Sequence, residues 1–480
     1  MTKKSITKNY IYNLIYQILI LVLPLVTTPY ISRVLGATNI GIYSYTYSIV
    51  SYFILFGALG VSMYGQREIA YAGENISKRK KIFYEIISFR FITVFFALLV
   101  YALFFMIKGE YSIYYRIWAL ELIATAVDIS WFFQGMEEFK KTVVRNVLVR
   151  LISVGLIFIL VKNQSDLIKY VTIYAIADLI GNISLWFYLP KYFKGIKVKN
   201  INAKRHIIPI ILLFIPQIAG QVYNMLDKTM IGRMIADKSE VGYYEEAIKV
   251  IKVLVTIISS LGIVMVPRMA SVFASGEHEK VRDYLKKSFQ FTFLLGIPMT
   301  FGIISISEAF VPIFFGNGFD KTIILMNVLS PIIVLCGVTS VIGYQYLLPT
   351  KRQKEYTFSI VIGIIVNFTL NYIMIKLWKS VGAAIATSIS QLIVAIVQIY
   401  IIRKDLSIKE LVHLNYKYIL SGIVMLIICI LLKNILGLGL KAMVIQILAG
   451  ITTYFVCLIV LKDDYFKMIL YRLKLIVRRK

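Results

Sequence analysis

The sequence predicts an all-α, polytopic membrane protein, and three observations support this fold class: its composition, the length of its apolar runs and the placement of its charges. Of the 480 residues, 59% are hydrophobic and 16% are charged, against about 25% charged residues in typical soluble proteins. The formal net charge of +28 lies in short segments between apolar runs, not on a soluble basic face. Membrane topology therefore explains this charge better than nucleic-acid binding does, and we expect no nucleic-acid partner.

About 14 apolar runs are long enough to cross a hydrocarbon core that is about 30 Å thick. The first run, from about 10 to 32, follows a basic cluster as a secretory signal would, but its 23 residues contain no A-x-A cleavage site. Because a signal h-region has only about 7 to 15 residues, we predict an uncleaved first helix. The other runs lie at about 41–64, 82–107, 113–134, 143–161, 168–190, 207–235, 244–267, 288–307, 322–348, 356–375, 381–402, 416–432 and 442–461.

The Lys and Arg residues between these runs predict the orientation of the chain. The amino terminus, the even-numbered connections and the tail together hold 36 of them, whereas the odd-numbered connections hold 12. Positive charge in short loops favours the cytoplasmic side of a membrane. We therefore expect a multi-pass protein of the cytoplasmic (inner) membrane with both termini in the cytoplasm.

The sequence also contains a repeat of about 200 residues. The segment IGRMIADKSEVGYY restates ISRVLGATNIGIY, so that Arg33 and Arg233 lie 200 residues apart and Gly41 and Gly242 lie 201 apart. Because six helices form each copy, both copies enter the membrane in the same sense, which predicts a parallel repeat with the transport site between two lobes. The predicted domains are an N-terminal six-helix lobe at 1–200, a C-terminal six-helix lobe at 201–405, and two extra transmembrane helices with a basic cytoplasmic tail at 406–480.

The tail itself has amphipathic spacing. Phe466, Ile469 and Leu473 share one helical face, and Lys467 and Lys474 share another. This pattern suits an interfacial helix on the anionic inner leaflet. A frayed basic end that serves only as a topology signal is the alternative.

Missing motifs exclude several chemistries. None of the 28 glycines is followed by Lys, so the chain has no GxxxxGK[ST] phosphate loop. The three histidines lie in predicted loops and the three cysteines are isolated in apolar runs, so we expect no metal site and no disulfide framework. No D-x-D motif and no long external connection are present. We therefore expect neither an enzyme nor a cofactor.

The stretch 216–243 is polar where its setting is apolar, and it forms the centre of the predicted site. Helical spacing gathers five of its polar side chains on or beside one face: Gln217, Gln221, Asn224, Asp227 and Lys228. Such a face avoids lipid and suits a watery cavity. Interhelical hydrogen bonds that only hold the bundle together are the alternative, as is a local pair between Asp227 and Lys228.

Polar stripes on other predicted helices extend this cavity. Asn146 and Ser153 share a face with a basic residue, and Glu121 shares a face with Asp128. Asp128 and Asp178 lie near mid-depth, where a charge costs about 3 kcal/mol or more, so we favour them as sites of proton or sodium coupling. Basic residues within about four residues of the end of a run are counted with the adjacent connection, and five others lie deeper inside predicted helices: Arg90, Arg150, Lys228, Lys249 and Lys252.

Three segments resemble the Wzx-type oligosaccharide flippases of the multidrug/oligosaccharidyl-lipid/polysaccharide (MOP) superfamily. They are PYISRVLGATNIGIYSY from Pro29, DISWFFQGMEEFKK from Asp128, and LDKTMIG from Leu226 followed by SEVGYY. The resemblance is weakest over the last two helices. It implies two six-helix lobes around a central cavity, alternating access, and a short oligosaccharide on undecaprenyl pyrophosphate as substrate. It also assigns motif positions to Arg33, Asp128, Gln134, Gly135, Asp227, Lys228 and Gly232.

The predicted function is a flippase for undecaprenyl-pyrophosphate-linked oligosaccharides in the assembly of O-antigen, capsule or exopolysaccharide. A buried pyrophosphate needs cationic partners, and a buried glycan needs hydrogen-bonding groups. Arg90 and Arg150 lie toward the cytoplasmic ends of their helices and suit inward capture, whereas the three lysines lie further out and suit release. Ordinary snorkelling of the arginines is the alternative. The candidate cavity residues are Arg33, Arg90, Asn146, Arg150, Gln217, Gln221, Asn224, Asp227, Lys228, Lys249 and Lys252.

Two other functions stay open on the sequence alone. An ion-coupled multidrug antiporter would have acidic and aromatic linings with few cations. A scaffold for a polysaccharide-assembly complex would need no cavity residue for export. For the flippase, we expect membrane lipids, a polysaccharide polymerase and further assembly proteins as partners.

Overall fold

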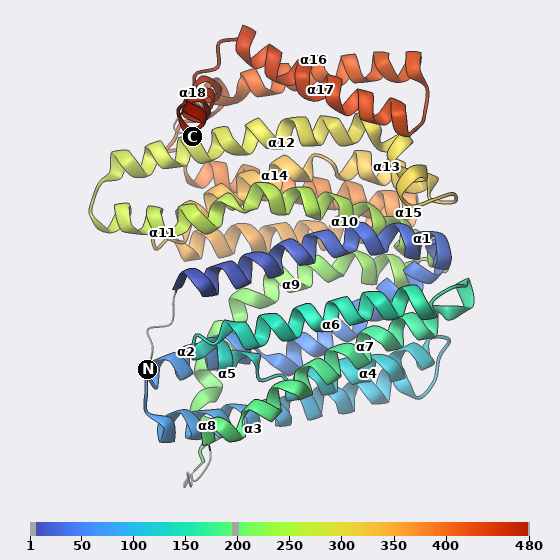
Figure 1. Ribbon diagram of the computed structural model, residues 1–480, viewed down its shortest axis with the longest axis vertical. Coiled ribbons are helices and arrows are strands. Elements are labelled where there is room, and N and C mark those ends of the chain that lie inside the picture. The colour runs from blue at the N-terminus through green and yellow to red at the C-terminus, as the bar shows by residue number, and fades with distance from the viewer. Residues whose placement is uncertain (1–5, 194–200, 479–480) are drawn as a thin grey trace. The chain divides into compact units, whose positions relative to one another are not determined.

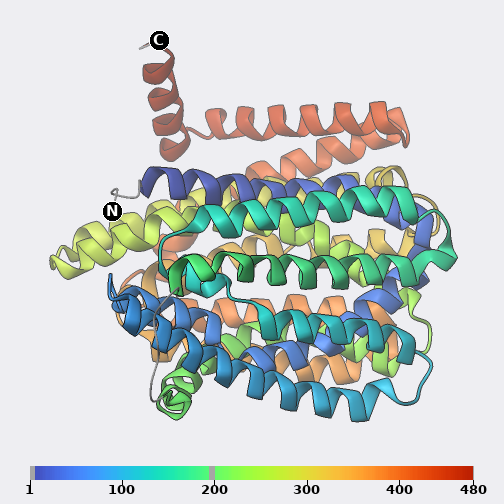
Figure 2. The same ribbon diagram turned by 60° about the horizontal axis from the view of Figure 1, so that its bottom comes forward.

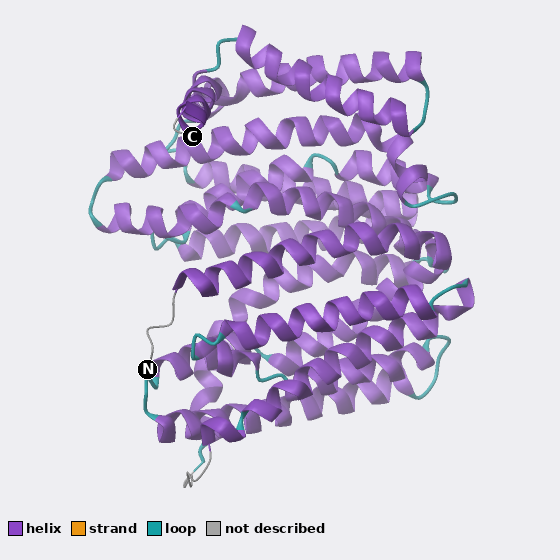
Figure 3. Ribbon diagram, viewed as in Figure 1, coloured by secondary structure: helices purple, strands orange, loops and turns teal. Residues whose placement is uncertain are grey.

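The computed structural model describes the backbone at residues 6–193 and 201–478, and the side chains there except at 6–18, 21, 215–217, 219, 223–224, 263, 473–474 and 476–478. The residues that it describes form helices and loops, with no strand among them (Figure 3). The predicted all-α fold class is therefore confirmed. The chain divides into two compact units, Met1–Gly242 and Tyr243–Lys480.

The first unit is a bundle whose long helices run side by side (Figure 1). Short helices and 3-10 or π turns connect them. The elements of this unit are α1 (Ile6–Ala58), α2 (Val61–Tyr71), α3 (Ile76–Tyr101), η1 (Ala102–Met106), α4 (Ser112–Val127), α5 (Ser130–Gly135), α6 (Phe139–Leu160), η2 (Gln164–Asp166), α7 (Leu167–Ser184), η3 (Leu185–Tyr188), α8 (Pro190–Phe193), η4 (Ala203–His206) and α9 (Ile207–Met234).

The second unit is also helical. Its first helix, α10, begins at Ser239 in the sequence, just before the unit boundary at Tyr243. Its elements are α10 (Ser239–Ser259), α11 (Leu261–Ala274), α12 (His278–Phe314), α13 (Asp320–Leu329), α14 (Ile332–Ser340), η5 (Val341–Leu347), α15 (Gln353–Ile401), α16 (Ile408–Leu436), α17 (Leu440–Val460) and α18 (Asp464–Arg478). The predicted lobes assign α9 to the second lobe, whereas within the first unit α9 contacts α1 and α2. The lobe boundaries stay a prediction.

The helices are consistent with 14 membrane crossings. Eleven stretches of the described residues are long and apolar enough to span a membrane. Two of them contain two predicted runs each, because α1 kinks at Gly36 (φ 72°) and α15 kinks at Lys379 (φ 53°). The 28-residue α9 adds a further long helix.

The predicted run 113–134 is not one helix but two, α4 and α5. The backbone leaves the helical conformation at Asp128 (φ −70°, ψ 113°). The Asp128 side chain accepts hydrogen bonds from the Ser130 amide (2.9 Å) and the Ser130 hydroxyl (2.5 Å), as in an Asx turn. A local side-chain hydrogen bond to the backbone therefore competes with helical hydrogen bonding at a point where apolar composition alone would continue the helix.

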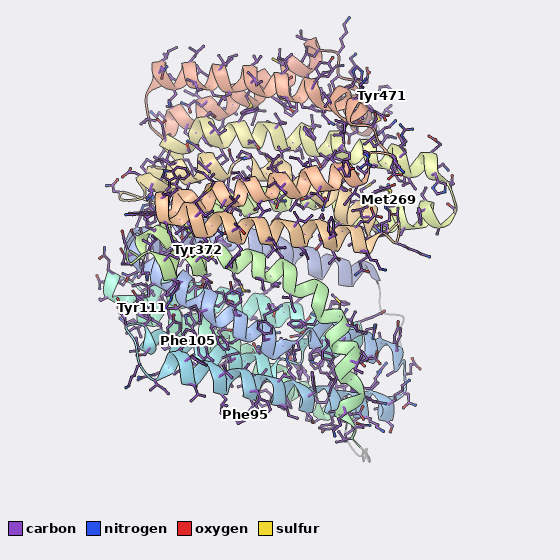
Figure 4. The ribbon with its side chains drawn as sticks, turned by 180° about the vertical axis from the view of Figure 1, so that it is seen from behind. Phe95, Phe105, Tyr111, Met269, Tyr372 and Tyr471 are labelled. Atoms are coloured by element: carbon purple, nitrogen blue, oxygen red, sulfur yellow. The ribbon has the colours of Figure 1, made fainter. Side chains whose placement is uncertain are left out.

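Outward-facing side chains of the bundles are apolar, as a bilayer requires. On α3, Phe95 is 60% exposed and points away from the bundle (Figure 4). Phe96 and Leu103 beside it are also exposed. These surfaces, together with the candidate spans, establish a multi-pass membrane protein.

The segment that leads into α9 is fixed to α3 by a buried cluster. His206 Nδ1 lies 2.7 Å from the Tyr64 hydroxyl, and His206 Nε2 lies 3.0 Å from Glu85 Oε2. Glu85 also accepts a hydrogen bond from the Asn202 amide at 2.9 Å and pairs with Arg205. Since Glu85 is fully buried, these partners are needed to offset the cost of burying its charge.

The last helix, α18, runs across the direction of α16 and α17 (Figure 2). Asp463 holds its start by accepting hydrogen bonds from the Tyr418 hydroxyl (3.2 Å) and the Phe466 amide (2.8 Å). The Phe466 ring stacks on Phe455 with centroids 5.0 Å apart. This orientation supports the predicted helix along the membrane surface.

Candidate functional site

Four side chains from four helices form a charged cluster inside the first unit. Glu121 on α4 is 8% exposed and interacts electrostatically with Asp178 on α7 and Arg150 on α6. Tyr47 on α1 interacts with all three of these groups. Glu121 thus lies within electrostatic range of a guanidinium and of a second carboxylate, at a depth where an isolated charge would be costly.

Aromatic rings surround this cluster. The Tyr47 ring lies 4.9 Å from Trp118, and the Tyr43 ring lies 5.0 Å from Tyr170 and 6.1 Å from Tyr174. Rings with polar tips give a cavity both apolar faces and hydrogen-bonding groups. The sequence signal for these rings is the tyrosine pairs spaced four residues apart on α1 and α7, which share a helical face.

Arg90 and Asp128, predicted for phosphate capture and ion coupling, are partners of one another. Arg90 is 2% exposed; its Nη2 lies 3.5 Å from Asp128 Oδ2 and its Nη1 donates to the Asp128 carbonyl at 2.8 Å. Arg145 donates to the Ser130 hydroxyl and to Asn182 Oδ1, both at 2.6 Å. This network holds the α4–α5 break in place, and the two predicted transport roles stay predictions.

The polar stretch at the centre of the prediction lies on α9. The side chains of Gln217 and Asn224 lie outside the described residues, and Gln221 is exposed. Asp227 is 6% exposed and Lys228 is half-buried. The structure therefore describes the side chains of only part of the predicted polar face of α9.

The C-terminal part of α9 packs on α1 through polar groups. The Thr229 hydroxyl lies 2.9 Å from the Ser48 hydroxyl, and Tyr52 interacts with both Thr229 and Asp227. Two candidates lie apart from this contact: Arg33 is exposed and donates to the Pro29 carbonyl at 3.1 Å, and Asn146 is half-buried on α6.

The two copies of the repeated motif meet where α1 passes the end of α9. A Cβ atom at Gly41 would lie 1.7 Å from the Lys238 carbonyl oxygen, and one at Gly242 would lie 2.0 Å from the Ala37 carbonyl oxygen. A Cβ atom at Gly232 would lie 2.0 Å from the Tyr45 ring. Glycine is therefore required here for close backbone approach, and we name these residues the repeat junction.

Lys238 stabilises the repeat junction through hydrogen bonds to the backbone. Its ammonium donates to the carbonyls of Gly232 (2.7 Å) and Ile235 (2.9 Å) and lies 5.1 Å from the centre of the Tyr45 ring. Burial lowers the pKa of this lysine, and Glu110 opposes that shift. The carbonyls and the ring stabilise the ammonium at the end of α9.

The other motif glycine is also a packing position. A Cβ atom at Gly135 would lie 2.6 Å from the Gln66 carbonyl oxygen and 2.8 Å from Ile69. Gln134 beside it is half-buried. Gly135 therefore lets α5 pack closely against α2.

In the second unit, the candidate Lys249 on α10 already faces two carboxylates. Its Nζ lies 2.8 Å from Glu246 Oε1 and 3.9 Å from Glu245 Oε1, and Glu246 is 1% exposed. Lys252, one turn further along, lies within electrostatic range of Cys336. A phosphate at Lys249 would have to compete with these acidic groups.

A buried amide cluster in the second unit was missed by the sequence analysis. Asn371 Nδ2 donates to Asn367 Oδ1 (3.1 Å), and Asn367 Nδ2 donates to the Thr387 hydroxyl (3.3 Å), which also lies 3.3 Å from the Tyr244 hydroxyl. The signal was two asparagines spaced four apart in an apolar run. In the described part of the chain, no group of three or more His, Cys, Asp or Glu residues could hold a metal ion.

Comparison with known families identifies the family to which the chain belongs. The model of the family described as "Polysaccharide biosynthesis protein" matches residues 6–273, more than half of the sequence. The chain belongs to the polysaccharide biosynthesis protein family. A second model, MatE, matches residues 209–373 of this family member.

Individual relatives agree with this assignment. The family member is 25% identical over 408 residues to the "Putative O-antigen transporter" of Escherichia coli (strain K12), covering 84% of the chain and 98% of the relative. It is 25% identical over 303 residues to the "Probable low-salt glycan biosynthesis flippase Agl15" of Haloferax volcanii, with 63% of each covered. Its fold matches a structure titled "Lipid II flippase MurJ, inward closed conformation" with a TM-score of 0.65, at 17% identity over 93% of this chain and 98% of the other. The resemblance predicted from three segments is thereby confirmed.

Proposed function

We propose that the protein is a flippase that moves undecaprenyl-pyrophosphate-linked oligosaccharide repeat units across the cytoplasmic membrane for the assembly of surface polysaccharide. The observation that carries this proposal is the match along 98% of a relative named as an O-antigen transporter. The charged and aromatic cluster of the first unit supports it. Polar groups that bind a glycan and a cation that binds phosphate are the chemistry that such a substrate needs.

In this proposal Arg150 binds the pyrophosphate and the surrounding rings and hydroxyls bind the sugars. Because Glu121 interacts electrostatically with both Arg150 and Asp178, an incoming phosphate competes with a carboxylate for the guanidinium. A carboxylate that loses its cationic partner in a poorly hydrated site favours its protonated form. Phosphate binding is then linked to uptake of a proton, or of a sodium ion, at Asp178 or Glu121.

The topology and partners belong to the same proposal. Both termini lie in the cytoplasm, as the excess of basic residues in the even-numbered connections predicts. The transport cycle is alternating access, and no catalysis is involved. A polysaccharide polymerase and assembly proteins use the product on the outer side of the membrane.

An antiporter for cationic drugs is the second candidate. The MatE match and the two carboxylates among aromatic rings favour it, since such groups suit a cationic ligand. Arg150 beside the carboxylates opposes it. The two candidates differ in a measurable way, because only the flippase links loss of the protein to accumulation of lipid-linked oligosaccharide.

The test compares cells that lack the protein with cells that carry Arg150→Gln, Glu121→Gln or the double variant at matched protein level. Accumulation of lipid-linked oligosaccharide on the cytoplasmic face and susceptibility to cationic drugs are both measured. We expect the deletion and Arg150→Gln to accumulate the oligosaccharide without any change in drug susceptibility. Lys441→Gln, which removes an exposed lysine, is the matched control and exports normally.

The double variant separates two roles of the arginine. If Arg150 binds phosphate, Glu121→Gln does not restore export to Arg150→Gln. If Arg150 only neutralises the carboxylates, the double variant exports better than Arg150→Gln. Changed drug susceptibility with no accumulation of oligosaccharide would replace the flippase by the antiporter.

A further inference from the structure

A cavity of about 780 Å³ lies between α6 and α7 of the first unit. These helices contact one another and run side by side in Figure 1. None of the charged cluster around Arg150 lines this cavity. The cavity is therefore separate from the proposed transport site.

The walls of the cavity are apolar and open. Leu148 and Ile152 on α6 and Ile180 on α7 are 53%, 58% and 61% exposed, and all three line the cavity. Its floor is formed where the two helices touch, because a Cβ atom at Gly181 would lie 2.7 Å from Val149. Gly181 thus lets the two helices pack closely at the base of the groove, where Val149 also lines it.

One end of the groove is cationic. Lys140, Lys141 and Arg145 line it there, and no acidic residue is among the described residues of its lining. Lys141 Nζ forms an ion pair with Glu138 Oε2 at 2.6 Å and lies 4.4 Å from the centre of the Tyr192 ring. Lys140 is exposed, and the Arg145 guanidinium is held in position by its hydrogen bonds at the α4–α5 break.

The length of the groove matches one leaflet. Lys140 and Ile152 are 12 positions apart on α6, which is about 18 Å at the helical rise. The hydrocarbon region of a single leaflet is about 15 Å deep. The predicted topology places the cationic end at the cytoplasmic face, where anionic lipids are concentrated.

We propose that this groove binds one anionic phospholipid of the inner leaflet. Its phosphodiester lies at Lys140 and Arg145, and one acyl chain lies against Leu148, Ile152 and Ile180. The exposed Lys140 ammonium suits a phosphate oxygen, and the Arg145 guanidinium, whose two Nη atoms donate to Asn182 and Ser130, adds a fixed positive charge beside it. The groove ends after one leaflet and so fits an acyl chain better than a longer polyprenyl chain.

Native mass spectrometry of the detergent-purified full-length protein tests the proposal by counting bound lipid as phosphatidylglycerol or phosphatidylcholine is added. Wild type retains one phosphatidylglycerol in preference to phosphatidylcholine. Lys140→Gln weakens phosphatidylglycerol binding by about five-fold, the effect expected for one basic residue near a membrane surface. Ile152→Trp fills the groove and removes the retained lipid.

Matched controls distinguish the groove from general membrane adhesion. Lys441→Gln removes an exposed lysine elsewhere, and Ile365→Trp enlarges a side chain that is 60% exposed on α15; both bind lipid as wild type does. Equal retention of the two lipids, or wild-type retention by Ile152→Trp, overturns the proposal. So does displacement of phosphatidylglycerol by an equimolar polyprenyl phosphate, which would assign the groove to the carrier lipid.

Discussion

Replacing Gly41 with alanine destabilises the repeat junction. The new Cβ atom would lie 1.7 Å from the Lys238 carbonyl oxygen and 2.6 Å from the carbonyl carbon, so a backbone segment must move. Overpacking costs about 1–3 kcal/mol, and the upper end applies because no flexible side chain can yield. Alanine returns about 1 kcal/mol of helix propensity. We expect a net loss of about 2 kcal/mol in the free energy of unfolding, measured as a lower unfolding midpoint in detergent.

Gly155→Ala is the matched control for this experiment. Gly155 lies inside α6, and a Cβ atom there meets nothing within 4 Å. The variant therefore keeps the gain in helix propensity without the clash, and its unfolding midpoint stays level or rises. Equal midpoints for Gly41→Ala and Gly155→Ala would refute the close contact between α1 and the segment after α9.

Three further predictions address other parts of the chain. Glu85→Gln lowers the free energy of unfolding by about 2 kcal/mol, because the buried carboxylate 3.0 Å from His206 Nε2 is lost; an unchanged midpoint contradicts this. Reporter fusions after Lys199 read cytoplasmic and fusions near Lys238 read external, whereas an external reading at Lys199 would overturn the six-plus-six arrangement. Asp178→Asn keeps the shape of the side chain and removes dependence of export on a proton or sodium gradient; normal export across the pH range and without sodium assigns Asp178 a structural role.

The spans could be predicted from the sequence because the length of an apolar run is a local property. The break between α4 and α5 could not be predicted in this way, since neither Gly nor Pro marks it. Its signal is the Asx-turn sequence of Asp128, Ile129 and Ser130, in which the carboxylate accepts from the Ser130 amide at 2.9 Å. A polar residue inside an apolar run can therefore mark a local turn as well as a functional group.

This break also explains why the candidate site was predicted only in part. Helical spacing places Glu121 and Asp128 on one face, so both seemed to serve one cavity. In the structure the helix ends at Asp128, and the two carboxylates have different partners. Glu121 interacts with Arg150, and Asp128 pairs with Arg90. The sequence predicts depth in the membrane, but partners on other helices depend on tertiary packing.

Three of the basic residues inside the helices face acidic partners. Arg90 pairs with Asp128, Lys249 pairs with Glu246, and Arg150 interacts with Glu121. Such pairing is expected, because a bare charge is expensive inside a membrane. Counting cations in the sequence therefore overstates the positive potential that a pyrophosphate would meet.

The charge balance around Arg150 then decides whether the site attracts an anion. With both Glu121 and Asp178 ionised, the three groups carry a net charge of −1, which repels a pyrophosphate. With one carboxylate protonated the net charge is zero, and the guanidinium becomes available to phosphate oxygens. Under the proposed function, a site built in this way gains its affinity for the substrate only when it takes up a cation. Arg150 with its two acidic neighbours can therefore serve both substrate binding and ion coupling, which the sequence analysis had assigned to separate residues.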